Sequence, residues 1–142
     1  MPIRTKRWND PREQDDGYRL LVCRYRPRGV RREGEPWDAW CPELSPSIEL
    51  HAAAYGKDGS PPIAWEEYTG RYLDEMSAQG FWIRGFAERL REGETITLLC
   101  SSACVDAARC HRTLLAKRLE DEARPPEATP AAARTRIHRR AR

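Results

Sequence analysis

Two short apolar runs predict two buried β-strands. Residues 18–25, "YRLLVCRY", have an uninterrupted apolar centre, and residues 95–100, "TITLLC", combine β-branched and apolar side chains. Runs of this length, bounded by turn residues, are typical of strands that are buried on both faces. Residues 3–8, "IRTKRW", alternate loosely and predict a further short strand that pairs at an edge of the sheet.

Helical periodicity follows in the middle of the chain. Trp65, Tyr68, Tyr72 and Met76 recur at steps of three and four residues, which predicts a helix with one apolar, core-facing stripe. A second helix is expected from residue 81 or 82 to residue 90, and a third over residues 110–123.

Local start and stop signals predict one more helix before this region. Ser45 or Ser47 is a suitable N-cap residue, and Gly56 is a suitable stop. The segment around Trp37 and Trp40 is expected to form a short helical turn.

The order of these elements predicts the fold class. Two strands joined by a long helical connection are expected to be parallel, with a right-handed crossover. The 142-residue chain should therefore form an α/β domain over residues 1–123, with a small, mostly parallel sheet of three or more strands and helices packed on it. Residues 124–142, rich in Pro, Ala and Arg, predict a basic, disordered tail.

Charge is distributed unevenly between these two parts. Residues 124–142 carry a local net charge of +5, whereas residues 1–123 carry −2. Only the tail is therefore expected to attract nucleic acid through charge alone. The sequence shows no apolar run of membrane-spanning length, and residues 1–10 lack the apolar segment of a signal peptide. We therefore expect a cytoplasmic protein with reduced cysteines, no signal peptide and no membrane partner.

Two loops should meet at one edge of the predicted sheet. Ligands of parallel sheets bind beyond the carboxyl ends of the strands, where the loops after residues 25 and 100 begin. One loop is rich in arginine and the other in small and hydroxyl residues, a combination suited to an anion. The predicted ligand-binding residues are Arg26, Arg28, Ser101, Ser102 and Arg112.

Three cysteines and a histidine lie close together in the second loop, and four interpretations of them are open. Cys100, Cys104, Cys110 and His111 are possible zinc ligands, although their C-x3-C-x5-C-H spacing differs from the paired C-x2-C of common zinc sites. Alternatively, Cys110 is a reactive thiol at a helix N-terminus and forms a catalytic pair with the adjacent His111. The loop is otherwise an anion cradle, which is the interpretation we favour and which needs no cofactor, or a turn that simply requires small residues.

Several segments together resemble the domain-of-unknown-function 488 family. They are "DGYRLLVCRYRPRGVRR", "DAWCPELSPSIEL", "IAWEEYTGRY" and "ITLLCSSACVDAARCHRTLLAKRLE", and the resemblance runs from residue 3 to residue 122. It implies a bacterial or archaeal cytosolic α/β domain without a settled activity, and many members carry the C-H-R element that is Cys110-His111-Arg112 here. Cys23 stands where many relatives are expected to have Asp, so no role of that Asp is carried over.

These observations favour a protein that binds an anionic small molecule or nucleotide-like ligand at the carboxyl edge of the sheet, with thiol chemistry as an accompanying hypothesis. The alternative is a module that binds nucleic acid or a protein partner through its arginine-rich loop and tail.

Overall fold

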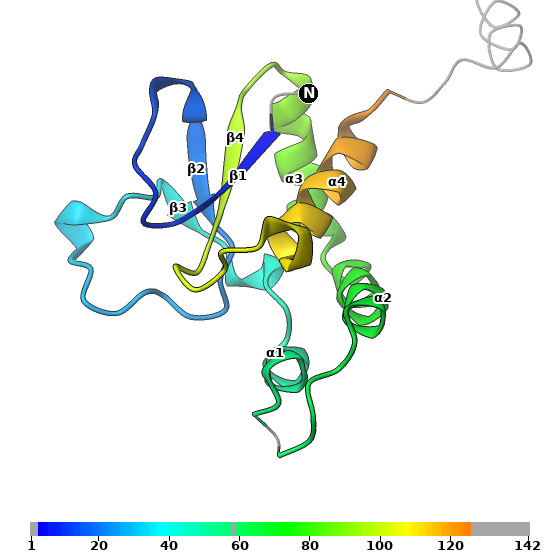
Figure 1. The fold of residues 1–142 in the computed structure, drawn as a ribbon. Helices are drawn as coiled ribbons and strands as arrows, with labels where there is room; N and C mark the ends of the chain where they lie inside the picture. The colour runs from blue at the N-terminus through cyan, green and yellow to red at the C-terminus, as the bar shows by residue number, and fades with distance from the viewer. Residues whose placement is uncertain (1–2, 58, 126–142) are drawn as a thin grey trace, which may run out of the picture.

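A four-stranded parallel sheet forms the centre of the molecule (Figure 1). The computed structural model describes residues 3–57 and 59–125. Its strands are β1 (Ile3–Arg7), β2 (Tyr18–Leu21), β3 (Ala39–Trp40) and β4 (Ile96–Cys100), in the spatial order β1-β4-β2-β3. Every pair of neighbouring strands is parallel. The predicted α/β class and the parallel pairing of the two apolar strands are therefore confirmed.

Both faces of the central strands are buried, as their continuous apolar sequence predicts. Leu20 pairs in register with Leu98, and both side chains join the core beneath the helices. The next pair, Leu21 and Leu99, faces the opposite side and packs in a second cluster with Trp37. The alternation of side chains along the strands therefore supplies two apolar surfaces.

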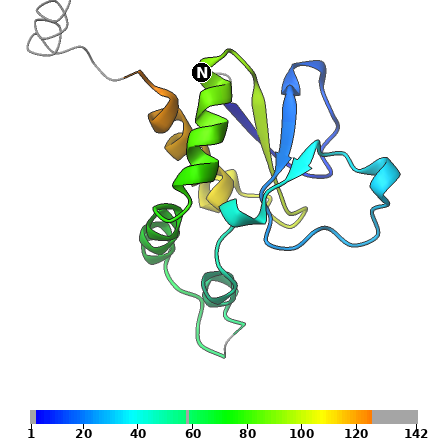
Figure 2. The same cartoon turned by 180° about the vertical axis from the view of Figure 1, so that it is seen from behind.

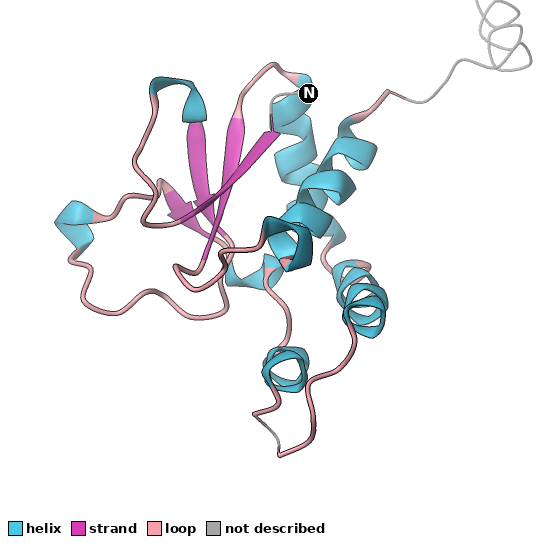
Figure 3. Ribbon diagram, viewed as in Figure 1, coloured by secondary structure: helices cyan, strands magenta, loops and turns pink. Residues whose placement is uncertain are grey.

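The described residues form four α-helices, which pack against and beyond this sheet (Figures 2 and 3). They are α1 (Ile48–Tyr55), α2 (Trp65–Met76), α3 (Gly80–Arg91) and α4 (His111–Ala123), and each corresponds to a predicted helix. Helices α3 and α4 lie side by side on one face of the sheet, whereas α1 and α2 lie toward the carboxyl ends of the strands. Short 3-10 helices cover Gln14–Asp16, Arg32–Gly34, Pro42–Leu44 and Ala107–Arg109.

Local capping fixes the position of α1. The Ser47 hydroxyl accepts a hydrogen bond from the Leu50 N–H at 3.1 Å, as expected for an N-cap residue, and it also donates to the Glu75 carboxylate in α2. Gly56 ends the helix in the left-handed conformation, with φ at 69°. These contacts hold α1 against α2 at the edge where β2 and β4 end.

The prediction of a short helical turn around Trp37 and Trp40 is wrong. Residues 39–40 form β3 instead, and β3 lies at the edge of the sheet next to β2. The Cys41 N–H donates to the Leu21 carbonyl at 2.9 Å, and the Trp40 indole N–H donates to the Cys23 carbonyl at 2.8 Å. Pairing with a distant strand therefore determines this conformation, which local sequence signals do not encode.

Two further predictions concern the ends and the surroundings of the chain. Most of the predicted tail, residues 126–142, lies outside the described residues. Within residues 3–57 and 59–125, no helix combines the length and the apolar character needed to cross a membrane.

Candidate functional site

The loops that follow β2 and β4 lie together at the carboxyl edge of the sheet, because these strands are parallel neighbours. Two adjoining hollows occur there. We call the first the arginine groove. It has a volume of about 410 Å³ and is lined by Trp8, Cys23, Arg24, Tyr25, Arg26, Pro27, Arg28, His51, Ser101 and Ser102.

Four of the five predicted ligand-binding residues line this groove, namely Arg26, Arg28, Ser101 and Ser102. Their side chains are not equally available. Arg26 is paired with Glu35 at 2.6 Å, and its guanidinium lies 5.3 Å from the centre of the Trp37 ring. Arg28, by contrast, is exposed to solvent.

Arg24 also lines the groove, although we did not select it from the sequence. Its Nε donates to the Pro46 carbonyl at 3.0 Å, and one of its terminal nitrogens donates to the Ser45 carbonyl at 3.5 Å. Backbone carbonyls orient this guanidinium without cancelling its positive charge. The sequence signal was its place in the arginine-rich loop beside Arg26 and Arg28.

Arg112 lies apart from the other predicted ligand-binding residues. It is in the first turn of α4, is only 5% exposed, and lines neither hollow. Two of its nitrogens, Nε and Nη1, have no hydrogen-bond partner among the described residues. Arg112 lies on the face of α4 that packs against the rest of the protein. Its position next to His111 in the sequence did not indicate this burial.

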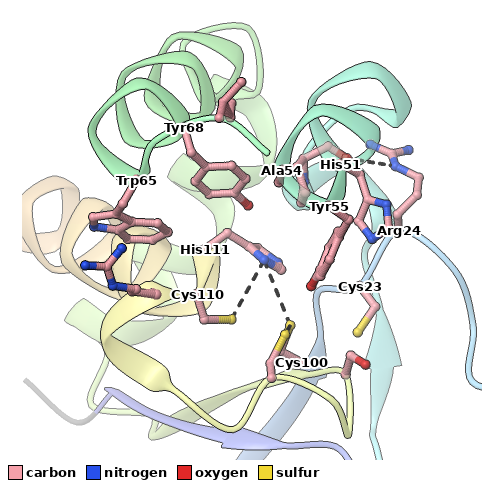
Figure 4. Close-up of a pocket in the computed structure, with 15 residues that line it drawn as sticks. Cys23, Arg24, His51, Ala54, Tyr55, Trp65, Tyr68, Cys100, Cys110 and His111 are labelled. Atoms are coloured by element: carbon pink, nitrogen blue, oxygen red, sulfur yellow. Dashed lines mark hydrogen bonds between the residues drawn. The ribbon is translucent and has the colours of Figure 1, made fainter. Parts of the chain in front are cut away.

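The second hollow, the thiol pocket, has a volume of about 250 Å³ (Figure 4). Its walls come from the end of β2, from α1 and α2, and from the segment that joins β4 to α4. It is lined by Cys23, Arg24, Pro46, His51, Ala54, Tyr55, Ile63, Trp65, Tyr68, Cys100, Ser101, Cys104, Arg109, Cys110 and His111. Cys23, Arg24, His51 and Ser101 belong to both hollows, so the two are continuous.

The cysteine and histidine cluster converges within the thiol pocket. The sulfurs of Cys100, Cys104 and Cys110 all lie within 4.8 Å of one another, and the Cys100 and Cys104 sulfurs are 3.3 Å apart. The Nδ1 atom of His111 lies 3.9 Å from the Cys100 sulfur and 4.0 Å from the Cys110 sulfur. Cys100 and Cys110 are buried, whereas Cys104 is partly exposed.

A hydrogen bond fixes the orientation of the His111 ring. Its Nε2 atom lies 2.7 Å from the Val22 carbonyl, which has only acceptor capacity, so Nε2 carries the ring proton. Burial lowers the pKa of His111, and the neutral ring then presents the lone pair of Nδ1 to the thiols. The arrangement places one basic nitrogen beside two sulfurs.

Hydrogen bonding within the cluster shifts the pKa of its three cysteines in different directions. Hydrogen bonds from the Cys100 thiol, which has the larger effect, and from the Cys110 thiol lower the pKa of Cys104. The pKa of Cys100 and the pKa of Cys110 are raised by hydrogen bonding within the cluster. Cys110 forms the N-cap of α4 and is 4% exposed, and the hypothesis that it reacts stays a prediction.

Aromatic residues surround both hollows, and the sequence revealed only part of their role. Tyr68 and Tyr72 are buried as predicted, but Trp65 and Tyr68 also line the thiol pocket. The His51 ring lies between Tyr25 and Tyr55, with ring centres at 6.1 and 4.8 Å. Tyr25 and Tyr55 are more than half exposed, at 59% and 55%.

Proteins of bacterial origin resemble parts of this chain. The uncharacterized protein YeaO from Escherichia coli K12 is 39% identical over 77 residues, which cover 54% of this chain and 64% of YeaO. The uncharacterized protein Rv3073c from Mycobacterium tuberculosis H37Rv is 31% identical over 74 residues, covering 52% of this chain and 59% of Rv3073c. The chain thus spans less than two thirds of the length of each of these relatives.

No solved structure matches the chain. The family model of the active DUF488-N3 subclade matches residues 3–123, which include both hollows and all strands and helices of the part of the chain that the structure describes. The resemblance seen in the sequence is thereby confirmed, and the chain belongs to the DUF488 family.

Proposed function

We propose that this protein binds an anionic, nucleotide-like small molecule in the arginine groove. The observation that carries the proposal is the composition of this one hollow. Arg24 and Arg28 from the loop after β2 and Ser101 and Ser102 from the loop after β4 line it together. Guanidinium groups and hydroxyls are suitable partners for phosphate or carboxylate oxygens.

The three arginines of the groove differ in whether a carboxylate neutralises their charge, and they therefore have different roles. Arg26 is already neutralised by Glu35, so its guanidinium contributes little net charge to the groove. Arg24 is held by backbone carbonyls and keeps its charge, and Arg28 is exposed. We therefore assign anion recognition chiefly to Arg24 and Arg28, with Arg26 shaping the groove wall against Trp37.

The exposed aromatic rings beside the groove favour a ligand that also has a planar ring. Tyr25 lines the arginine groove, His51 lines both hollows, and the exposed Tyr55 lines the thiol pocket. Exposed tyrosine rings provide apolar area and stacking surfaces at binding sites. A phosphate near Arg28 and a base near the tyrosines would together occupy the continuous hollow.

Isothermal titration calorimetry with magnesium-free ADP, adenosine and inorganic phosphate tests this proposal. ADP is expected to bind more tightly than either fragment, and its affinity should fall as the NaCl concentration rises. Arg28→Ala should weaken ADP binding about tenfold or more, because a hydrogen bond to a charged group contributes about 1.5–3 kcal/mol.

Arg84→Ala is the matched control. Arg84 is an exposed arginine on α3 that lines neither hollow, so its loss changes the net charge equally without altering the groove. Equal ADP affinities of the Arg28→Ala and Arg84→Ala variants would contradict the proposal. The same would follow if adenosine bound as tightly as ADP at every salt concentration.

The rival function is binding of nucleic acid or a protein partner through the arginine-rich loop and the tail. Its separate support is the net charge of +5 on residues 124–142. Deleting residues 126–142 should abolish salt-dependent binding of single-stranded oligonucleotides while leaving ADP binding unchanged. We place the ligand-binding function in the cytoplasm, where the free cysteines would stay reduced.

A further inference from the structure

We propose that Cys100, Cys104, Cys110 and His111 together bind one zinc ion. The residues come from four consecutive parts of the chain: the last residue of β4, the following loop, the N-cap of α4 and its first residue. The sulfurs of the three cysteines lie within 4.8 Å of one another in the thiol pocket, and Figure 4 shows the His111 ring directed at Cys100 and Cys110. Three thiolates and an imidazole are a common ligand set for tetrahedral zinc.

The spacing of the ligand atoms agrees with that geometry. Zinc bonds of about 2.3 Å to sulfur and about 2.0 Å to nitrogen place tetrahedral ligand atoms roughly 3.5–3.8 Å apart. The Cys100 and Cys104 sulfurs are 3.3 Å apart, and Nδ1 of His111 lies 3.9 and 4.0 Å from the sulfurs of Cys100 and Cys110. These three distances differ from the tetrahedral values by a few tenths of an ångström, and the three sulfurs all lie within 4.8 Å of one another.

The hydrogen bond on the far side of the His111 ring supports the same assignment. Zinc-binding histidines usually donate their second ring N–H to a carboxylate or a backbone carbonyl, which fixes the ring and its protonation. His111 makes this contact with the Val22 carbonyl at 2.7 Å. Its free lone pair on Nδ1 is consequently directed at the sulfurs.

Backbone conformation resolves the main objection from the sequence, the adjacency of Cys110 and His111. Cys110 has extended dihedral angles, with φ at −132° and ψ at 141°, and helical geometry begins only at His111. The change of conformation between the two residues lets both side chains face the same point. Two adjacent residues within the helix would diverge by about 100° around its axis.

The alternative of a single reactive thiol explains fewer of these features. A thiol nucleophile requires one sulfur and one base, and it leaves two further sulfurs at contact distance without a role. Cys41 shows the arrangement of an isolated cysteine in this fold, since it is buried beside Glu43 and away from the cluster. Three thiols within 4.8 Å of one another, two of them beside one histidine nitrogen, are the arrangement of a metal site.

Such an ion would have four protein ligands and therefore a structural role. It would link the end of β4 to the start of α4 and thereby fix the intervening loop, residues 101–109. This loop carries Ser101 and Ser102, which line the arginine groove. The zinc site is independent of the ligand proposal, because ADP binding can fail while metal binding succeeds, and the reverse also holds.

Cobalt(II) titration of the reduced, chelator-treated full chain under anaerobic conditions tests the site. We expect one equivalent of Co²⁺ to bind, with the intense visible bands of tetrahedral cobalt and a near-ultraviolet thiolate-to-cobalt band of the intensity given by three thiolates. Zn²⁺ should displace the colour stoichiometrically. If the wild-type protein does not bind Co²⁺, or gives the weak spectrum of octahedral cobalt, the proposal is overturned without any need for variants.

Two cysteine variants give a matched comparison. Cys104→Ser should lower the Co²⁺ affinity by more than about 100-fold. Loss of a residue that only hydrogen-bonds to a metal ligand usually lowers the affinity by about 10- to 100-fold, and loss of a ligand itself should have a larger effect. Cys41→Ser, which removes a cysteine outside the cluster, should bind Co²⁺ like the wild type. Equal affinities of the two variants, or rapid alkylation of Cys110 in the zinc-loaded protein, would contradict the proposal.

Discussion

At the scale of single residues, a buried ion pair at the start of β2 links stability to pH. Asp16 and Arg19 are both fully buried, and Arg19 donates to the Asp16 carboxylate at 2.6 Å. Burial opposes the charge on Asp16, but hydrogen bonds from Lys6, the Glu13 N–H and Arg19 outweigh it and lower its pKa to about 2. The charged form is thus stabilised in the folded state.

The pH dependence of unfolding tests this ion pair. A folded-state pKa below the ordinary value of 3.8 stabilises the protein above about pH 4, and this contribution of about 2 kcal/mol is lost as the pH falls toward 2. We expect urea unfolding of the wild type to show this loss. Asp16→Asn should be less stable at pH 7 and should lack this part of the acid sensitivity.

Asp15→Asn is the control for the pair, because the neighbouring Asp15 side chain is 77% exposed and pairs with Arg4 at the surface. Its unfolding free energy should change by less than about 1 kcal/mol at pH 7, as is usual for exposed ion pairs. A wild-type-like stability of Asp16→Asn at pH 7 would show that the buried pair has no such role.

At the scale of elements, Gly17 sets the close approach of β2 to β4. Its φ is +63°, and a Cβ atom there would lie 2.4 Å from the Thr95 carbonyl oxygen. The next residue, Tyr18, donates its N–H to that same oxygen at 2.9 Å. A side chain at position 17 would therefore disturb the first hydrogen bond between the two strands.

Two glycine substitutions should have opposite effects on the unfolding free energy. Gly17→Ala should destabilise the protein by about 1–3 kcal/mol or more, from backbone conformation and steric conflict combined. Gly70→Ala should stabilise it by up to about 1 kcal/mol, since position 70 lies within α2 and a Cβ atom there meets nothing within 4 Å. Chemical denaturation measures both, and a shared sign would refute this account of Gly17.

Elements with local signals were predictable from the sequence. Helix α1 begins after Ser47 and ends before Gly56 because a hydroxyl cap and a left-handed glycine act within the helix itself. The buried strands were recognisable because an apolar run is required on both faces. Strand β3 was missed because its two residues owe their conformation to pairing with β2.

The sequence predicted the part of the candidate site that depends on strand direction, namely the meeting of the two loops at one edge of the sheet. Parallel strands bring Arg28 and Ser102 to one groove, and the topology argument anticipated this. Burial of Arg112 and the contributions of Tyr55 and His51 were not predictable, because they depend on how α1 and α4 pack in three dimensions. Convergence of the sulfurs likewise depends on the loop path between β4 and α4.

At the scale of the whole molecule, ligand recognition is assigned to the hollow between two loops and not to the basic tail. The described residues, 3–57 and 59–125, contain both hollows and the strands and helices that position them. Deleting residues 126–142 is therefore expected to leave the ADP affinity within about twofold of the full chain, measured by calorimetry. A large loss on deletion would transfer the function to the tail.

Mapping of ADP binding by two-dimensional ¹H–¹⁵N NMR tests the central claim most directly. The account predicts that ADP shifts the backbone amide signals of residues 22–26, 28 and 101–104, while those of α3 around Glu88 stay in place. It also predicts that Arg28→Ala removes most of these shifts and Arg84→Ala does not. Shifts confined to residues 126–142 or to α3, or no shifts at millimolar ADP, would contradict the account.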